Sequence, residues 1–281
     1  MKPTSKRLDL YWFSGSGNTL RAAQIFAARL EELGYTVRLL PMEQADPSQI
    51  DPEATFGLAF PTYCFSIPER VRKFVRELPT VHETQAIMLG THGAISGGVL
   101  GPMKRWLTRK GFDCLAGTIV TMPDSFFPFF GKKTNDRLLT RAAKKIVRFA
   151  EKYDQGTARW RRWPILSDLS GAFWYAVFSS RRITSITAST VHVNSNVCVG
   201  CGICEQYCPV GAITMIDGKT AQRNTQCVNC LRCVALCPQD AMRHLIGFSP
   251  YRSEVADMLQ QRFAENLENT TVPLSAEEPE L

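Results

Sequence analysis

Eight of the ten cysteines in this 281-residue chain lie between Cys198 and Cys237. They form two copies of one pattern, C-x2-C-x2-C-x3-C-P, and every cysteine of the first copy recurs 29 residues later. Four potential ligands and a proline at one constant offset indicate a duplicated unit. This segment must therefore fold so that two equivalent sets of thiols are gathered.

The cellular compartment decides what these thiols can do. The first residues, Met1–Arg7, lack the apolar stretch of a secretory signal, so we expect a cytoplasmic protein. Disulfides are rare there, and a dense cysteine cluster is then typical of metal ligation. The chain has no apolar run near about 18 residues, so we expect no membrane span, with peripheral membrane contact left open.

Iron–sulfur ligation fits the spacing better than zinc does. A structural zinc ion takes four ligands in a tetrahedron, usually as two pairs separated by a folded spacer. Three cysteines at two-residue spacing wrap one corner of a cubane cluster, and the fourth points away to a second cluster. The segment resembles the bacterial two-cluster ferredoxins over residues 190–246.

This resemblance implies two [4Fe–4S] clusters with crossed ligand sets. The first cluster takes Cys198, Cys201, Cys204 and Cys237. The second takes Cys227, Cys230, Cys233 and Cys208. Gly200 and Gly202 would let backbone amides approach the sulfurs, and no histidine replaces a cysteine, which excludes a Rieske-type site and favours a low potential.

The first 150 residues have the pattern of an alternating α/β domain. Five short β-branched or aromatic runs are predicted strands: Leu8–Phe13, Thr36–Leu40, Thr55–Phe60, Ala86–Thr91 and Gly117–Met122. Helical spacing is found in residues 20–33, 68–78, 99–109 and 138–149. Strands that alternate with helices predict a doubly wound parallel sheet, whose ligands bind beyond the carboxyl ends of the strands.

The loop after the first strand, Ser14–Thr19, reads S-G-S-G-N-T. Its glycines let a ligand approach the backbone, its side chains offer hydroxyl and amide groups, and the following helix adds its positive dipole end. The loop therefore predicts an anion with several oxygens. It lacks a P-loop lysine and the G-x-G-x-x-G pattern, which disfavours a nucleoside triphosphate or a dinucleotide. A turn without a ligand is the alternative.

This part of the chain resembles the flavodoxin-like family over residues 6–152. Its loop is similar to the FMN-phosphate loop of that family at Ser14, Ser16, Gly17, Asn18 and Thr19. The resemblance implies the strand order 2-1-3-4-5 and one non-covalent FMN. It implies the following flavin-binding residues: Ser14, Gly15, Ser16, Gly17, Asn18, Thr19, Pro61, Thr62, Tyr63, Thr91, His92 and Gly93.

The two loops expected around the flavin ring are less specific than the phosphate loop. Tyr63 is the best candidate to stack on the ring, and a place in the core is its alternative. Residues 91–98 contain no aromatic side chain, so His92 and the backbone would cover the second ring face, or this face would be open to a partner. A plain loop histidine is the alternative for His92. Cys64 has no neighbouring base and is expected to be a plain thiol. We assign no catalytic residue.

The formal net charge of +7 first points to nucleic acid or another anionic surface. Two clusters with eight thiolates carry about −4 and an FMN phosphate about −2, which leaves about +1. We therefore expect no nucleic-acid partner. Residues 137–162 contain nine Lys or Arg against two acidic residues, which predicts a solvated helix face or, alternatively, a surface for an acidic redox partner.

These patterns divide the chain into four segments. They are an FMN-binding domain (1–152), an aromatic and basic connector (153–190), a ferredoxin domain (191–247), and a C-terminal helix with an acidic tail (248–281). We expect the connector, with Trp160, Trp163 and the aromatic run 171–178, to pack between the domains. A place on a membrane surface is its alternative. The four phenylalanines of residues 126–130 belong to the same interface or cover a substrate pocket.

The pairing of modules resembles the anaerobic flavodoxin–ferredoxin fusion proteins. Iron–sulfur clusters move single electrons, whereas a flavin accepts two and can release them one at a time. We expect an electron-transfer protein that links a low-potential donor to an acceptor. Two alternatives stay open: an FMN-dependent reductase of a quinone or other conjugated compound, and a two-cluster ferredoxin whose flavodoxin-like domain binds no flavin. The donor, the acceptor and the oligomeric state are not predicted.

Overall fold

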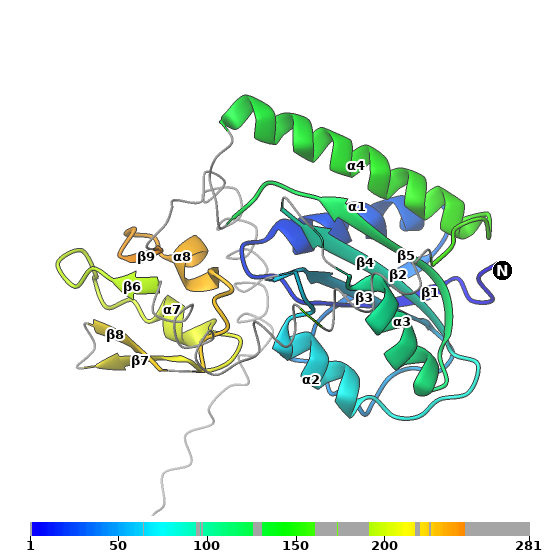
Figure 1. The fold of residues 1–281 in the computed structure, drawn as a ribbon, viewed down its shortest axis with the longest axis horizontal. Helices are drawn as coiled ribbons and strands as arrows, with labels where there is room; N and C mark the ends of the chain where they lie inside the picture. Colours follow the sequence, from blue (N-terminus) through cyan, green and yellow to red (C-terminus); the bar gives the residue numbers. More distant parts are fainter. Residues whose placement is uncertain are drawn as a thin grey trace, which may run out of the picture.

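The computed structural model describes residues 2–63, 65–93, 96, 98–125, 131–160, 173, 191–216, 220–224 and 226–244. These residues form a larger part around one sheet and a smaller part of short strands and helices beside one edge of it (Figure 1). Within the described ranges, no helix has the length and apolar character needed to span a bilayer.

The larger part is built on a parallel sheet with the order β2-β1-β3-β4-β5. Its strands are β1 (Arg7–Trp12), β2 (Thr36–Pro41), β3 (Thr55–Pro61), β4 (Gln85–His92) and β5 (Asp113–Thr121). This is the order of flavodoxin-like doubly wound sheets, so the predicted fold class is confirmed. β5 starts before the predicted Gly117, because pairing with β4 begins at Asp113 in a stretch poor in β-branched residues.

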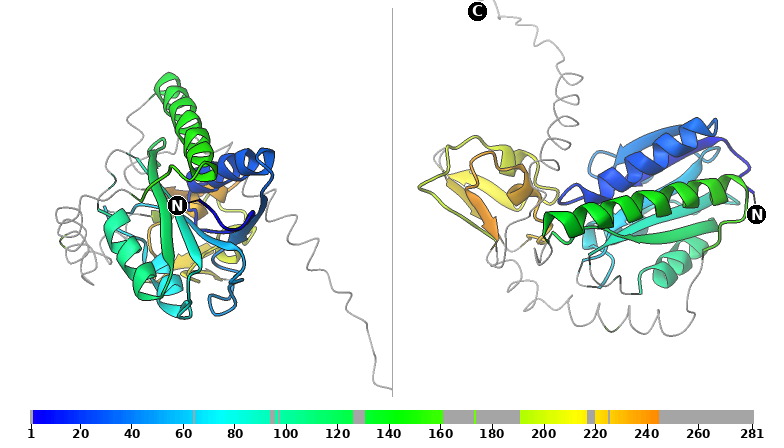
Figure 2. Two further views of the ribbon diagram at one scale, coloured as in Figure 1. Left: turned by 90° about the vertical axis from the view of Figure 1, so that its right-hand side faces the viewer. Right: turned by 90° about the horizontal axis from the view of Figure 1, so that it is seen from above.

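Helices cover both faces of this sheet (Figure 2). One face carries α1 (Asn18–Glu32) and α4 (Lys132–Asp154), and the other carries α2 (Glu69–Glu77) and α3 (Leu100–Arg109). Burial on two sides explains why the central strands are continuous apolar runs and do not alternate.

The larger part continues past residue 152, where its end was expected. α4 ends at Asp154, and Trp160 is buried against Gly117 of β5, with its indole N–H donating to the Leu100 carbonyl at 3.0 Å. Trp160 therefore belongs to the core of the sheet domain and not to a connector. Phe173 is exposed. The following lie outside the described residues: Cys64, 126–130, 161–172, 174–190 and 245–281.

The smaller part contains two antiparallel strand pairs and two short helices. The pairs are β6 (Val191–Val193) with β9 (Met242–His244), and β7 (Ile213–Ile216) with β8 (Thr220–Arg223). The helices are α7 (Ile203–Gln206) and α8 (Arg232–Leu236).

The backbone of the smaller part repeats with the cysteines. Its left-handed residues are Gly200, Gly202 and Gly211 in the first copy, and Asn229, Leu231 and Asp240 at the same offset in the second. Non-glycine residues adopt this conformation at a cost of about 1–2 kcal/mol. The second copy keeps the conformation despite that cost, so the duplication predicted from the cysteines extends to the fold.

Candidate functional site

The carboxyl ends of the strands bring the three predicted flavin loops together. The Thr62 amide donates to the Thr91 carbonyl at 2.7 Å, and the hydroxyls of Thr19 and Thr91 lie 2.7 Å apart. Tyr63 places its hydroxyl beside Gly15. Residues that are far apart in the sequence therefore line one edge of the sheet.

The phosphate loop is held in shape by its own side chains and by the loop after β5. Gly17 has a φ of 91° and donates its amide to Ser14 Oγ at 3.1 Å, directly before α1 begins. Asn18 Nδ2 donates to the Pro123 carbonyl at 2.9 Å, and the Ser16 and Ser125 hydroxyls are hydrogen-bonded. The first amides of α1 have no carbonyl partner within the helix, which makes this terminus suited to an anion.

Two polar atoms in the loops expected around the flavin ring, after β3 and β4, support the fit to a flavin. Thr62 Oγ1 and His92 Nδ1 are buried and have no hydrogen-bond partner among the described residues. A buried polar atom without a partner costs about 1–3 kcal/mol, so the pair fits a bound group with polar edges. Together with the phosphate loop, the donor set fits FMN.

The surroundings of His92 disfavour its protonated form. Its Nε2 lies 3.0 Å from the Thr121 hydroxyl, and burial, followed by the nearby Lys145 cation, lowers its pKa below the ordinary value. A neutral imidazole keeps one ring nitrogen as a donor and the other as an acceptor, which suits a polar ligand edge.

This shift predicts a pH dependence of stability. Below about pH 6.5 the unfolded chain binds a proton that the folded His92 resists, so the free energy of unfolding falls as the pH falls. We expect urea midpoints measured from pH 8 down to about pH 5 to fall less steeply in His92→Gln than in the unsubstituted protein. His82→Gln, at an exposed position, is the control. Equal slopes in all three proteins would contradict the assignment.

Tyr63 lies where the sheet domain meets the second cysteine pattern. Its ring meets Phe13 edge-on, with centroids 6.1 Å apart at 77°. Burial, followed by the nearby Cys230 thiol, raises its pKa well above the ordinary value. Tyr63 is half-buried and packs against the core of the sheet domain, and its stacking on a flavin ring stays a prediction.

The cysteines of the smaller part gather in two groups. A small cavity of about 20 Å³ is lined by Cys198, Cys201, Cys204 and Cys237, among others. Burial and then the neighbouring Cys201, Cys237 and Cys198 raise the pKa of Cys204 to about 11. Burial, with smaller contributions from Cys227 and Cys208, raises the pKa of Cys230 to about 11. These groups support the crossed ligand sets, which stay a prediction.

The cysteines of these two groups are free thiols. The nine cysteines of the described ranges form no disulfide. In the same ranges, no three His, Cys, Asp or Glu side chains come close enough together to hold a single metal ion.

Backbone amides reach the sulfurs at equivalent points of the two copies. The Ala212 amide donates to Cys208 Sγ at 3.1 Å, and the Ala241 amide donates to Cys237 Sγ at 3.2 Å. Hydrogen bonds of this kind stabilise thiolates and adjust the potential of a cluster. The last cysteine of each pattern, which precedes a proline, therefore accepts an equivalent backbone hydrogen bond in both copies.

The smaller part packs directly on the phosphate loop. A Cβ added to Gly15 would lie 1.9 Å from the Cys230 carbonyl oxygen, so the two backbones are in close contact. Arg232 Nη2 donates to the Ser14 carbonyl at 2.6 Å and also pairs with Glu43. Neither Arg232 nor Glu43 was predicted from the sequence as a site residue. The repeat held a signal for the first, because Arg232 stands where the first copy has Ile203.

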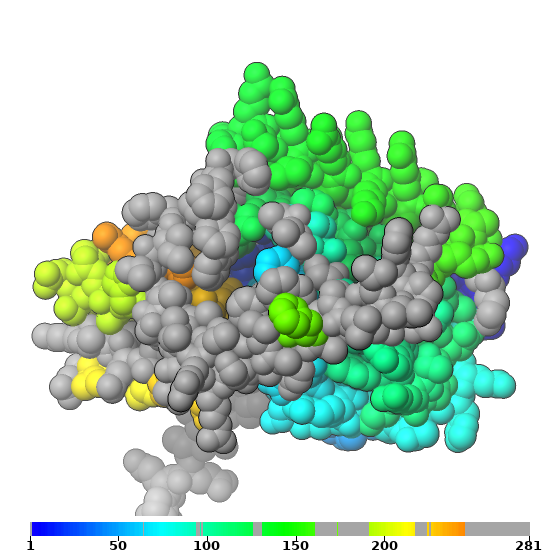
Figure 3. All heavy atoms as spheres, viewed as in Figure 1, coloured from blue at the N-terminus to red at the C-terminus, as the bar shows by residue number. Residues whose placement is uncertain are grey.

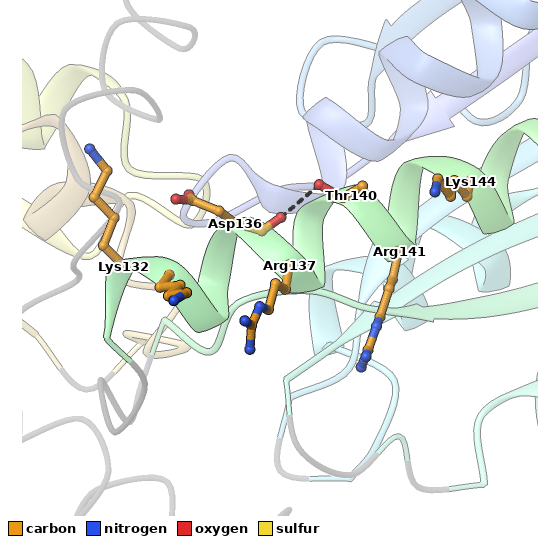
Figure 4. A pocket seen from close by; sticks show the side chains of 7 residues that line it. Lys132, Asp136, Arg137, Thr140, Arg141 and Lys144 are labelled. Atoms are coloured by element: carbon orange, nitrogen blue, oxygen red, sulfur yellow. Dashed lines mark hydrogen bonds between the residues drawn. The ribbon is translucent and has the colours of Figure 1, made fainter.

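Side chains of α4 project from the surface of the molecule (Figure 3), and the outer face of this helix carries a group of cations (Figure 4). A shallow hollow on it is lined by Lys132, Lys133, Asp136, Arg137, Thr140, Arg141 and Lys144. Asp136 is the one acidic member of this set, and its backbone carbonyl accepts the Thr140 hydroxyl at 2.9 Å. The predicted basic helix face is therefore present and exposed, and we call it the α4 basic face.

Comparison with known proteins gives one family and several structures. The 4Fe-4S binding domain family, Fer4, matches residues 191–214. No curated protein matches the chain. Because the family match covers a small part of the chain, it identifies an iron–sulfur segment and not a family for the whole protein.

The solved structures resemble the sheet domain. Rubredoxin oxygen:oxidoreductase from the anaerobe Desulfovibrio gigas is 23% identical with a TM-score of 0.38, over 54% of this chain and 37% of that chain. The Streptococcus pneumoniae TIGR4 flavodoxin is 17% identical with a TM-score of 0.41, over 53% and 98% of the two chains. A flavodoxin from the domain Archaea is 15% identical with a TM-score of 0.38, over 52% and 98%. The chain thus spans little more than a third of the oxidoreductase. It combines a flavodoxin-like parallel sheet with a 4Fe-4S binding segment.

Proposed function

We propose that this protein transfers electrons between two [4Fe–4S] clusters and an FMN carried on the same chain. The observation that carries the proposal is the contact between Gly15 in the phosphate loop and Cys230 in the second cysteine pattern. Electron transfer weakens steeply with distance, and with Cys230 as a cluster ligand this contact would bring that cluster close to the bound flavin.

The chemistry of the two groups is complementary. A [4Fe–4S] cluster exchanges one electron, and FMN takes up two. Two one-electron oxidations of reduced clusters therefore balance the reduction of one FMN, with protons taken from water. Placing both groups on one chain raises their effective concentration for each other.

The residues of the chain divide the work between two domains. In the sheet domain, Ser16, Asn18 and Thr19 would hold the phosphate with the N-terminus of α1, and Thr62 and His92 would contact the ring edges. In the second domain the eight cysteines would hold the clusters. A cytoplasmic site of action and redox proteins as partners complete the proposal.

Cofactor analysis of the anaerobically purified protein tests the proposal. We expect about eight irons and one FMN per chain, as two clusters and one flavin require. Protein that holds iron but takes up no FMN after reconstitution would leave a ferredoxin with a flavin-free sheet domain, and would contradict the proposal. About four irons per chain in place of eight would contradict the presence of a second cluster.

An acidic redox protein is the partner that the α4 basic face fits best. Opposite charges on two proteins steer their encounter and raise the association rate, an effect that salt screens. With a strongly acidic flavodoxin as probe, we expect the double substitution Arg137→Glu and Arg141→Glu to slow second-order electron transfer about tenfold at low salt.

The control for this test is the double substitution Lys73→Glu and Arg76→Glu, which reverses the same number of charges on α2, across the sheet from α4. It should leave the rate within about twofold, because charges far from the encounter surface are screened over about 10 Å. Equal slowing by the α4 and α2 variants would show that only total charge matters and would reject the α4 basic face as the docking surface.

A further inference from the structure

Arg232 breaks the duplication of the cysteine segment. It lies between Cys230 and Cys233, at the position that Ile203 occupies in the first copy. Its side chain is only 3% exposed. Arginine is almost never fully buried unless it is paired, so a charge that replaces an apolar residue at a buried position calls for specific partners.

Those partners belong mainly to the other domain. Arg232 Nε and Nη2 both donate to the Ser14 carbonyl, at 3.1 Å and 2.6 Å, and Nη2 also pairs with the Glu43 carboxylate. A longer bond of 3.4 Å runs from Nη1 to the Tyr207 carbonyl within its own domain. The guanidinium of Arg232 therefore links the second cysteine loop to the phosphate loop and to Glu43, which follows β2.

Apolar packing surrounds this polar tie. The guanidinium carbon lies 5.8 Å from the centroid of the ring of Phe13, the residue that follows β1. Ala235 and Leu236 of α8 are buried in the same cluster as Leu20 of α1. Arg232 is thus surrounded by a continuous interface, and its charge is shielded from water.

The two cysteine sites differ in their surroundings. In the first, Cys201 is exposed and the neighbouring Val199 is 64% exposed. In the second, the carbonyl of Cys230 lies against Gly15 of the phosphate loop. One site faces solvent, and the other faces the flavin loops.

We propose that Arg232 is a positioning residue that fixes the second cysteine site on the phosphate loop and makes its cluster the flavin-side cluster. The proposal rests on the proposed function for the identity of the two bound groups. The solvent-facing cluster is then the one that meets external partners. The buried cation also favours the extra negative charge that the nearby cluster gains on reduction, because charges interact more strongly away from water.

Three variants of the full-length, cofactor-loaded protein test the roles of charge and geometry. Arg232→Ile installs the residue of the first copy, Arg232→Lys keeps the charge but loses the planar fork, and Arg243→Ile changes an exposed arginine of β9. One measurement is the potential of each cluster by EPR-monitored titration. The other is hydrogen–deuterium exchange at residues 14–19.

We expect Arg232→Ile to lower the reduction equilibrium constant of one cluster about tenfold, which is about 59 mV for one electron. The other cluster should keep its potential, and exchange at residues 14–19 should rise at least tenfold. Arg232→Lys should raise this exchange while it keeps both potentials, and Arg243→Ile should change neither. Equal shifts of both clusters, or unchanged exchange in Arg232→Ile, would overturn the proposal.

Two further variants keep the test decisive. Cys208→Ala, which should retain only the first cluster, identifies the EPR signal that belongs to each site. Glu43→Gln leaves Arg232 in place and should raise the exchange at residues 14–19 less than Arg232→Ile does, even if the latter folds poorly. Protein with these shifts but without electron exchange between clusters and flavin would reject the proposed function and leave the role of Arg232 standing.

Discussion

Cys208→Ala is expected to lower the iron content from about eight to about four per chain. In the structure, Cys208 and Cys227 both lie near Cys230, whereas Cys204 lies near Cys198, Cys201 and Cys237. Cys208 belongs to the first pattern in sequence, but it lies near Cys230 of the second pattern. Losing it should therefore remove the cluster of the second site.

Two double variants separate this crossed arrangement from a sequential one. If Cys208 shares its cluster with Cys227, the pair Cys208→Ala and Cys227→Ala damages one site and retains about four irons. The pair Cys208→Ala and Cys198→Ala then damages both sites and retains almost none. Sequential ligation, in which each pattern binds its own cluster, predicts the reverse.

Iron analysis of the purified proteins gives the answer, and Cys114→Ala is the matched control. Cys114 is a half-buried free thiol next to Thr108 in the sheet domain, away from both sites. It should leave the iron content unchanged. Loss of iron in this control would mean that the content reports general instability and not ligation.

Gly15→Ala is expected to weaken the contact between the domains and the binding of FMN together. The added Cβ would lie 1.9 Å from the Cys230 carbonyl oxygen and 2.4 Å from the Tyr63 hydroxyl. A backbone atom cannot move aside as a flexible side chain can, so the two loops must separate. Overpacking of this kind costs about 1–3 kcal/mol, which corresponds to a loss of about 5-fold to 150-fold where that energy is drawn from FMN affinity.

Fluorescence titration with FMN and urea unfolding measure the two effects. Gly131→Ala is the control, because its Cβ would meet open space at the start of α4 and its φ of −65° suits any residue. We expect this control to bind FMN like the unsubstituted protein. If Gly15→Ala binds FMN and unfolds in urea like Gly131→Ala, the contact between Gly15 and the Cys230 carbonyl is not tight.

The sheet was predictable because its signals are local. β1, β3 and β4 are buried on both faces, and each reads as a short apolar run between turn residues. The sequence predicts the start of β5 too far along the chain. The first residues of β5, from Asp113, are extended because they pair with β4 and not because of their own strand propensity. Trp160 was assigned to the connector because its partner Gly117 is distant in sequence.

The candidate site was predictable in its loops but not in its interface. Fold topology fixes where strands end, so Ser14–Thr19 and Thr62 could be expected at one edge. The contact between Arg232 and Ser14 joins residues 218 positions apart. A single sequence contains no local signal for such a pair except the exchange of Ile203 for Arg232 between the two copies.

The proposed function requires that electrons pass between the clusters and FMN within one molecule. Anaerobic rapid-mixing spectroscopy can follow the flavin after the clusters of the loaded protein are reduced. We predict that the flavin becomes reduced at a rate that stays constant when the protein is diluted tenfold, because both groups belong to one chain. A rate that falls in proportion to the protein concentration, or a flavin that stays oxidised, would contradict the account.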